Sequence, residues 1–217
     1  MYKATDEEAR FKAYHDSLRR ELNNAYWHFI IYKNLDKFRE EYNKEMREAP
    51  EFWGLTQRAH LFDTIMRLNK ICDNDKDTVN IHTLLDLAEQ NVHIFTDESF
   101  TKRSPYSSKQ NLPKIDKRVL TRHRQKYATF YKTSLRKLRN KVLAHIDKDV
   151  VVQDFLPFKE WSVDAEQIDT IINDLDNTLH LLSTAYDGSR YDKEFAYIEQ
   201  GMYNVMDLIR IGLKKKR

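Results

Sequence analysis

Residues 135–147 decide the fold, and they read Leu-Arg-Lys-Leu-Arg-Asn-Lys-Val-Leu-Ala-His-Ile-Asp. Leu135, Leu138 and Val142 recur at intervals of three and four, a spacing typical of one face of a helix. The segment also places Arg139, Asn140 and His145 close together in the sequence, at the end of a strongly basic helix. We expect these three residues to carry the function and the rest of the chain to form the helical frame that presents them.

The same periodicity extends outward from this segment through most of the chain. It predicts helices over 5–49, 51–71, 81–91, 117–145, 163–186 and 190–213, followed by a basic tail at 214–217. The first may be one long helix or two with a kink near Asn34. The stretch 96–116 reads as the longest loop. Residues 78–79 and 150–152 read as extended links that could pair with each other.

Capping residues mark where these helices begin and end. Thr5 and Glu8 have the spacing of a capping box, in which each side chain satisfies a free backbone N–H of the other. Asn80, Asp116 and Ser162 are expected to cap the helices that follow them. We expect Pro50 to end the first helix, because proline cannot continue the hydrogen-bond ladder.

Composition supports an all-α fold. The chain has 217 residues, of which only four are Gly and four are Pro, so long uninterrupted helices are expected. We predict a bundle of about five to six helices with a long N-terminal helix, forming a single domain over 1–217 with its core at about 25–185. Cys72 is the only cysteine, which fits a reducing cytoplasm. No apolar run approaches the roughly 20 residues of a membrane span, so we expect no membrane association and a cytoplasmic location.

The helix before the central segment is unusually basic. Residues 117–141 contain no Asp or Glu, and their cations are Lys117, Arg118, Arg122, Arg124, Lys126, Lys132, Arg136, Lys137, Arg139 and Lys141. Ten like charges repel one another, so either acidic residues of a neighbouring helix or a bound polyanion must offset them. The acidic residues at 164–176, on the next predicted helix, could offset these charges. A phosphate-binding face is the second possibility, with Tyr127, Phe130 and Tyr131 mostly buried.

An arginine followed by four to six residues and a histidine is a motif of all-α ribonucleases, but it is weak by itself. Arg10…His15 and Arg118…His123 match it as well as Arg139…His145. The third match is a better candidate for a catalytic motif, because Asn140 follows the arginine directly and the match lies at the end of the basic helix. Without further support, His145 could equally be a core histidine, since it continues the apolar stripe.

At this point the sequence resembles the HEPN superfamily, and most closely its abortive-infection (Abi) type. The stretch 138–147 carries the resemblance, with support from Phe52-Trp53-Gly54-Leu55, from 58–63 and from 78–85. The likeness spans about 25–182. It implies a HEPN-like helical bundle and a metal-independent endoribonuclease, often a toxin or antiviral defence effector, that works as a homodimer with facing motifs. Some members of the superfamily lack activity.

Carried over to this sequence, the resemblance assigns catalytic positions to Arg139 and His145 and a polar supporting position to Asn140. Arg136, Lys137 and Lys141 would bind RNA beside them. Asp147 and Asp63 are expected to support the site, Asp63 on the family likeness alone. The resemblance implies no cofactor and no metal. Because no second catalytic domain is evident, any antitoxin partner is expected to be a separate protein.

Helix geometry limits how this site can form. Six residues along an ideal helix give roughly 240° of rotation and about 9 Å of rise, so Arg139 and His145 would not share a face. Either the helix bends or ends near Ala144, or Arg139 of one copy meets His145 of another across a two-fold axis. Histidine can accept and donate a proton near neutrality, and arginine can hold a phosphate with two hydrogen bonds. We therefore expect attack of a ribose 2′-OH on the adjacent phosphate, giving a 2′,3′-cyclic phosphate.

Other sites and functions are less well supported. His60 and Asp63 lie three apart on a predicted helix, but two ligands are too few for a metal site, so we expect no metal. Cys72 lacks a recognisable activating partner and reads as a small buried residue. The main alternative to an enzyme is a non-catalytic helical module that dimerises and binds RNA or a protein partner. A DNA-binding regulator is disfavoured because no helix-turn-helix with a short glycine turn is evident.

Overall fold

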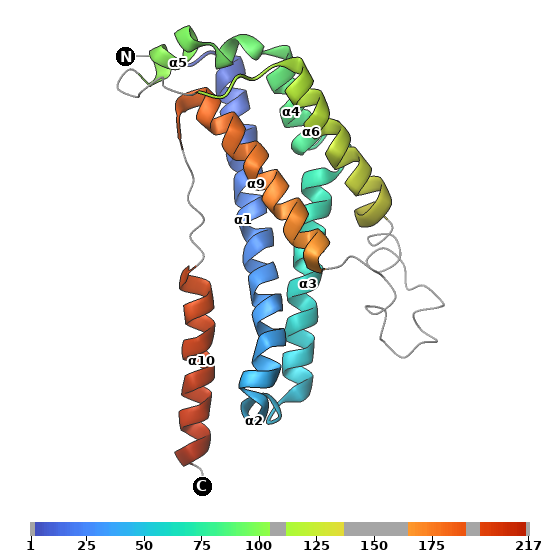
Figure 1. Ribbon diagram of the computed structural model, residues 1–217, viewed down its shortest axis with the longest axis vertical. Coiled ribbons are helices and arrows are strands. Elements are labelled where there is room, and N and C mark those ends of the chain that lie inside the picture. The colour runs from blue at the N-terminus through green and yellow to red at the C-terminus, as the bar shows by residue number, and fades with distance from the viewer. Residues whose placement is uncertain (1–2, 105–111, 137–164, 190–195, 216–217) are drawn as a thin grey trace. The chain divides into compact units, whose positions relative to one another are not determined.

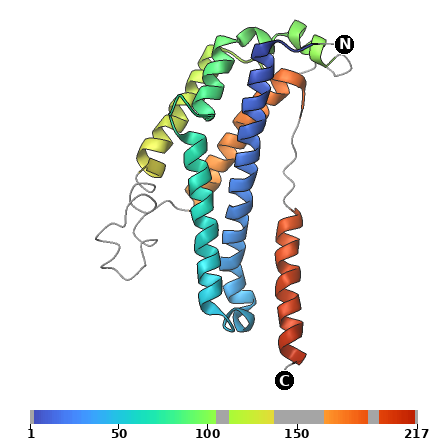
Figure 2. The same cartoon turned by 180° about the vertical axis from the view of Figure 1, so that it is seen from behind.

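The computed structural model describes residues 3–104, 112–136, 165–189 and 196–215, and every regular element in these ranges is a helix. Along the chain they are α1 (Asp6–Glu41), α2 (Asn43–Met46), α3 (Pro50–Cys72), α4 (Ile81–Gln90), η1 (Val92–Phe95), α5 (Asp97–Arg103), α6 (Lys117–Phe130), η2 (Tyr131–Leu135), α9 (Ala165–Asp187) and α10 (Ala196–Lys215) (Figures 1 and 2). The all-α prediction and the long N-terminal helix are confirmed. Ser162 and the predicted link at 150–152 lie outside the described residues.

Three predicted helix starts are confirmed by their capping hydrogen bonds. Glu8 accepts from the backbone N–H of Thr5 at 2.9 Å, and Thr5 accepts from the backbone N–H of Glu8 at 3.3 Å. Asn80 forms a capping box with Thr83. Asp116 accepts from the backbone N–H of Val119 at 2.8 Å. Each side chain satisfies a donor that the first helical turn leaves without a partner.

Of the two possibilities for the first helix, the structure has one long helix, because α1 continues through Asn34 without a break. Two other sequence expectations were wrong. α1 ends at Glu41, and Pro50 is the first residue of α3 rather than the end of α1. Proline suits the first turn of a helix, because its missing N–H would have no partner there. The expected loop at 96–116 contains α5, which begins where Thr96 accepts from the backbone N–H of Ser99 and which buries Phe100.

The chain divides into two compact units. Unit 1 comprises Met1–Leu22 and Leu68–Tyr191, and unit 2 comprises Asn23–Arg67 and Asp192–Arg217. α1 and α3 therefore contribute residues to both units. Cys72 lies in unit 1 with its side chain fully buried, as the sequence suggested.

In unit 1, one buried arginine holds several elements together. Arg103 donates from Nη1 to Glu8 at 2.5 Å and from Nε to the Tyr186 carbonyl at 2.9 Å, and it also donates to the Ile94 carbonyl. Its guanidinium lies 4.0 Å from the centre of the Tyr186 ring. Arg103 therefore ties α5 to α1, η1 and α9. Nearby, Gly188 adopts a φ of +77°, which suits glycine in the turn after α9.

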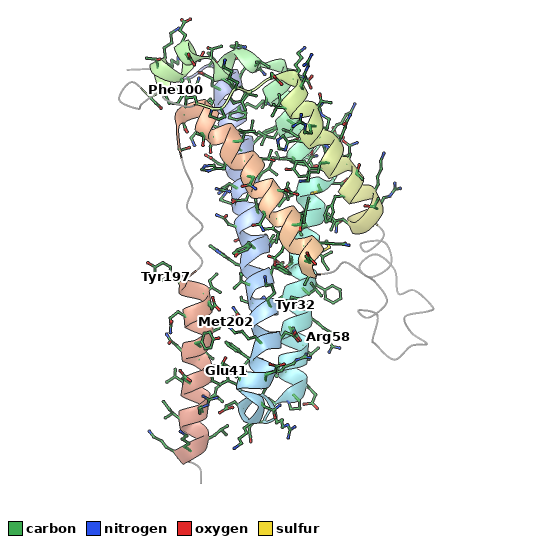
Figure 3. The ribbon with its side chains drawn as sticks, in the orientation of Figure 1. Tyr32, Glu41, Arg58, Phe100, Tyr197 and Met202 are labelled. Carbon is green, nitrogen blue, oxygen red and sulfur yellow. The ribbon has the colours of Figure 1, made fainter. Side chains whose placement is uncertain are left out.

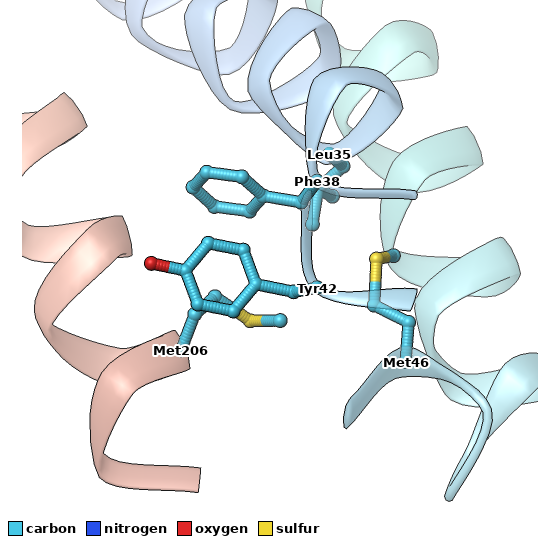
Figure 4. Packing of buried hydrophobic residues seen from close by; sticks show 5 residues of the cluster. All are labelled: Leu35, Phe38, Tyr42, Met46 and Met206. Atoms are coloured by element: carbon cyan, nitrogen blue, oxygen red, sulfur yellow. The ribbon is translucent and has the colours of Figure 1, made fainter. Parts of the chain in front are cut away.

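In unit 2, α10 packs beside the second half of α1 and beside α2. Met206 inserts into an apolar cluster with Leu35, Phe38, Tyr42 and Met46, shown in Figure 4. Polar contacts frame that cluster, because Tyr42 donates to Asp207 at 3.0 Å and Arg210 donates to Glu45 at 2.8 Å. An apolar groove of about 280 Å³ remains between α10 and the side chains of α1 and α3.

Candidate functional site

α6 carries the part of the basic helix that the structure describes. Two of its cations face acidic side chains. Arg124 contacts Asp86 and donates to Glu89 of α4 at 2.7 Å, and Lys126 pairs with Asp174 of α9. At these two positions, acidic side chains of neighbouring helices offset the positive charge, which is the first of the two possibilities that the sequence offered.

The other cations of this stretch are exposed, and none has an acidic partner within the described ranges. They are Lys117, Arg118, Arg122, Lys132 and Arg136. The tyrosines of the same stretch do not share this surface, because Tyr127 and Tyr131 are buried, as expected. Phe130 is half-buried. The exposed face of the helix is therefore cationic, and it suits phosphates better than stacked bases.

The helical ladder widens just before the predicted motif. Tyr131–Leu135 form a π-helix, η2, in which Leu135 is fully buried. Single π-turns of this kind often lie at functional sites. Arg136 follows η2 and is exposed, and it is the last residue of this stretch that the structure describes. Lys137, Arg139, Asn140, Lys141, His145 and Asp147 lie outside the described residues, so their geometry stays a prediction.

A cavity of about 430 Å³ lies between α6 and α9, close to η2. Its lining residues are Lys126, Phe130, Glu166, Gln167, Thr170, Ile171 and Asp174. Two carboxylates face this space, and the ammonium of Lys126 is already paired with one of them. The cavity is therefore a poor place for a phosphate, and the exposed cations of α6 suit one better.

The first of the other arginine–histidine matches is part of the protein core. His15 is buried, and its Nε2 lies 2.9 Å from the Leu179 carbonyl. Burial lowers the pKa of His15, although the bond to that carbonyl opposes the change. A buried and bonded imidazole of this kind holds α1 to α9 rather than meeting a substrate.

The second match is structural as well. His123 Nδ1 lies 2.8 Å from the Thr178 hydroxyl, and that hydroxyl also contacts Tyr127 Oη at 2.5 Å. Burial, followed by the charges of Lys126 and Arg122, lowers the pKa of His123. His15 and His123 thus have packing roles, whereas the third match, Arg139…His145, lies outside the described residues.

Asp63 lies in a different polar cluster, within unit 2. Its Oδ2 contacts Arg67 and lies 3.3 Å from His28 Nε2 on α1. The other nitrogen of His28, Nδ1, lies 3.0 Å from His60 Nδ1. The sequence had suggested His60 and Asp63 as a pair, but not His28, which is 32 positions from His60 and reaches it only through the packing of α1 on α3.

The geometry of this cluster favours one placement of its protons. The carboxylate of Asp63 favours a proton on His28 Nε2, which leaves Nδ1 of a neutral His28 free to accept. His60 Nδ1–H can then donate to it. Burial and the nearby charge of His28 lower the pKa of His60, and Asp63 opposes that change. Within the described ranges, no three His, Cys, Asp or Glu side chains are arranged to hold a metal ion.

Two properties of the whole chain, its hydropathy and its similarity to known proteins, bear on its function. None of the helices in the described ranges is long and apolar enough to cross a bilayer. Searches of curated proteins and of solved structures each found no match. A family model described as AbiU2, of the HEPN type, matches residues 8–206. Because that match spans most of the 217 residues, the chain belongs to the AbiU2 family of HEPN domains.

Proposed function

We propose that the protein is a metal-independent endoribonuclease of the HEPN toxin and phage-defence type. The observation that carries this proposal is the set of exposed cations without acidic partners in the described part of the chain, Lys117, Arg118, Arg122, Lys132 and Arg136, which precede the Arg139–His145 segment in the sequence. These cations attract the phosphates of RNA through counterion release. Membership of a HEPN family supports the same conclusion.

In this proposal the reacting groups are an imidazole and a guanidinium. His145 acts as general base or general acid: it takes the proton of a ribose 2′-OH or gives a proton to the leaving 5′-oxygen, as the 2′-oxygen attacks the adjacent phosphorus and displaces the next nucleotide. The second histidine of a homodimer can supply the other of these two roles. Arg139 holds the phosphate as negative charge builds on its oxygens, and Asn140 steadies the phosphate or the imidazole. The products are a 2′,3′-cyclic phosphate and a 5′-OH.

The neighbouring residues bind the RNA and support the reacting groups. Arg136, Lys137 and Lys141 contact flanking phosphates, and Asp147 orients His145. Asp63 supports the fold by holding His28 and Arg67. Because Arg139 and His145 would not share a face of one regular helix, we propose a homodimer in which each copy completes the site of the other. Any neutralising antitoxin is a separate chain.

The test is RNA cleavage by the purified protein in excess EDTA. We expect cleavage products that end in a 2′,3′-cyclic phosphate, and a loss of about 10²-fold or more in rate for both Arg139→Ala and His145→Ala. Arg20→Ala and His93→Ala replace exposed residues of the same types, and they should cleave at the unaltered rate. Absence of cleavage, or equal rates in His145→Ala and unaltered protein, would overturn the proposal.

The alternative is a non-catalytic HEPN module that binds RNA or a protein partner. The ion pairs of Arg124 and Lys126 favour it, because they show that part of the basic helix serves packing within the chain. Overexpression separates the two functions. A nuclease should slow growth, and Arg139→Ala should relieve the effect. A binding module should affect growth equally with and without that substitution.

A further inference from the structure

The cavity between α6 and α9 is lined by side chains that the proposed reaction does not use. Both helices belong to unit 1, and Figure 3 draws their side chains. Tyr127 of α6 donates to the Asp174 carbonyl of α9 at 2.9 Å, and His123, one turn earlier, lies 2.8 Å from the Thr178 hydroxyl, one turn later. The two helices therefore run antiparallel, and hydrogen bonds hold the walls of the cavity in place.

The lining combines apolar and polar side chains at the spacing of helix faces. Lys126 and Phe130 are four residues apart on α6 and so share a face. Phe130 and Ile171 supply apolar surface from opposite helices, and the other five lining side chains are polar. A flat ring with polar edges suits such a lining better than a hydrocarbon chain does. The residues that α9 contributes are Glu166, Gln167, Thr170, Ile171 and Asp174.

The charges of the lining select the groups on that edge. Two carboxylates, Glu166 and Asp174, outnumber the one ammonium, Lys126. Ionised carboxylates only accept hydrogen bonds, so the cavity favours a ligand with N–H groups over an anion. Its volume of about 430 Å³ lies within the range of about 300–1,000 Å³ that is usual for small-ligand sites. A nucleobase meets both requirements.

We propose that this cavity binds a guanine base of single-stranded RNA. The Watson–Crick edge of guanine carries one acceptor, O6, beside two donors, N1–H and N2–H. The ion pair of Lys126 and Asp174 offers the complementary order, because an ammonium donor lies beside a carboxylate that can accept twice. Lys126 donates to O6, Asp174 accepts from N1–H and N2–H, and Phe130 supplies an aromatic wall for the face of the base.

The other bases match this ion pair less well. Adenine and cytosine each carry one amino group beside a ring nitrogen that accepts, so one carboxylate oxygen of Asp174 would meet a lone pair. Uracil has a single N–H between two carbonyl groups. A polar group left without a partner weakens binding, so guanine should be preferred over all three. Hypoxanthine differs from guanine only in lacking the N2 amino group, and it isolates that one hydrogen bond.

The cations of α6 connect the cavity to a bound RNA. Arg122 lies one turn before Lys126, on the same side of α6, and it is exposed without an acidic partner in the described ranges. One turn is about 5.4 Å, so one nucleotide can place its phosphate at Arg122 and its base in the cavity. The inference rests on the proposed function for its substrate, RNA, and adds which base that substrate presents.

Binding of 2′-O-methyl oligonucleotides tests base recognition separately from cleavage, because these sugars have no 2′-OH to attack the phosphate. The probes are fluorescent oligouridylates that carry one guanine, one hypoxanthine or one adenine at the same position. By fluorescence anisotropy with the full chain, we expect the guanine probe to bind about tenfold more tightly than either of the others. Equal affinities for the three probes, or a preference for adenine, would overturn the inference.

Asp174→Asn tests the residue that reads the base. Its amide keeps the shape of the side chain but replaces one acceptor with a donor, so the affinities for guanine and hypoxanthine should come within about twofold of each other. The ratio is informative even if the variant is less stable, since a folding defect lowers both affinities alike. Glu98→Gln is the control, because Glu98 is exposed on α5, and it should keep the tenfold preference. An unchanged preference in Asp174→Asn would contradict the inference.

Cleavage of ordinary RNA in EDTA is scored independently of these affinities. If the probes show the guanine preference and RNA stays intact, the nuclease proposal fails and the base-binding cavity stands. If RNA is cleaved and the probes bind equally well, only the inference about the cavity fails.

Discussion

At the scale of single residues, the contact between His28 and His60 has the clearest chemical consequence. Two imidazole nitrogens 3.0 Å apart cannot both carry protons without repulsion, so one must accept from the other. Asp63 and Arg67 of α3 are the charged groups in contact with this pair. Protonating both imidazoles at once therefore costs stability.

This arrangement predicts how stability changes with pH. The pKa of His60 is lowered in the folded protein, whereas in the unfolded chain it is near the ordinary value of about 6.5. As the pH falls below about 6.5, the unfolded chain binds protons first, so the free energy of unfolding decreases. His60→Gln should therefore lose less stability between pH 7.5 and pH 5 than the unaltered protein, as measured by urea unfolding.

In His60→Gln the free energy of unfolding should still fall as the pH falls. Burial also lowers the pKa of His15, His82 and His123, and each acts with the same sign. His93→Gln is the matched control, because His93 is exposed, and its slope should equal that of the unaltered protein. Identical slopes for His60→Gln and His93→Gln would show that the histidine pair does not resist protonation in the folded state.

At the scale of elements, α6 combines two kinds of cation that the sequence could not distinguish. Arg124 faces carboxylates of α4, and Arg122, two positions away, is exposed without an acidic partner in the described residues. The difference arises from helix geometry, because residues two apart point in different directions. The same basic run can therefore serve both packing and recognition.

Substituting these two arginines should separate the two roles. Arg122→Gln should weaken RNA binding and lower the slope of log affinity against log salt by about one, since one phosphate contact is lost. Arg124→Gln should leave RNA affinity nearly unchanged. It should instead lower the free energy of unfolding by about 1 kcal/mol, because Asp86 and Glu89 lose their cation.

Fluorescence anisotropy with single-stranded RNA at several salt concentrations, together with urea unfolding, measures both effects. The idea of two kinds of cation fails if Arg124→Gln weakens RNA binding as much as Arg122→Gln does. Arg20→Ala provides the baseline for removal of an exposed arginine on another helix.

At the scale of the whole molecule, the chain has two compact units, each with its own buried side chains. Met206 is 1% exposed in the apolar cluster of unit 2, and Leu175 is fully buried in unit 1. Truncating either side chain to alanine leaves a cavity, which typically costs about 2–5 kcal/mol. If the two units open separately, each substitution should lower the stability of its own unit only.

Hydrogen exchange followed by mass spectrometry can locate these losses. Met206→Ala should speed exchange mainly in α2 and α10, and Leu175→Ala mainly in α6 and α9. Equal acceleration of all these elements in both variants would instead indicate that the molecule opens as one cooperative unit.

Much of the fold could be predicted from the sequence, because helix periodicity and capping are local properties. Thr5, Asn80 and Asp116 begin their helices where expected. α5 could not be predicted, because a helix this short has little periodicity and depends on burying Phe100 against other elements.

The candidate site was only partly predictable for the same reason. The sequence names Arg139 and His145 by their spacing, but spacing cannot say that His15 and His123 serve the core. Nor can it bring His28 to His60, since that contact exists only after α1 and α3 pack. Tertiary contacts decide which of several equivalent matches is structural.

The wide turn at Tyr131–Leu135 has a consequence for how this helix can change. A π-turn is equivalent to one added residue in a regular helix, so deleting a single residue there would restore the ordinary ladder. Because the wide turn accommodates the extra residue within one turn, Arg136 would keep nearly its present direction around the axis after such a deletion. A variant shortened by one residue within Tyr131–Leu135 would therefore lose the wide turn while Arg136 stays exposed, which separates the effect of the turn from the effect of the cation.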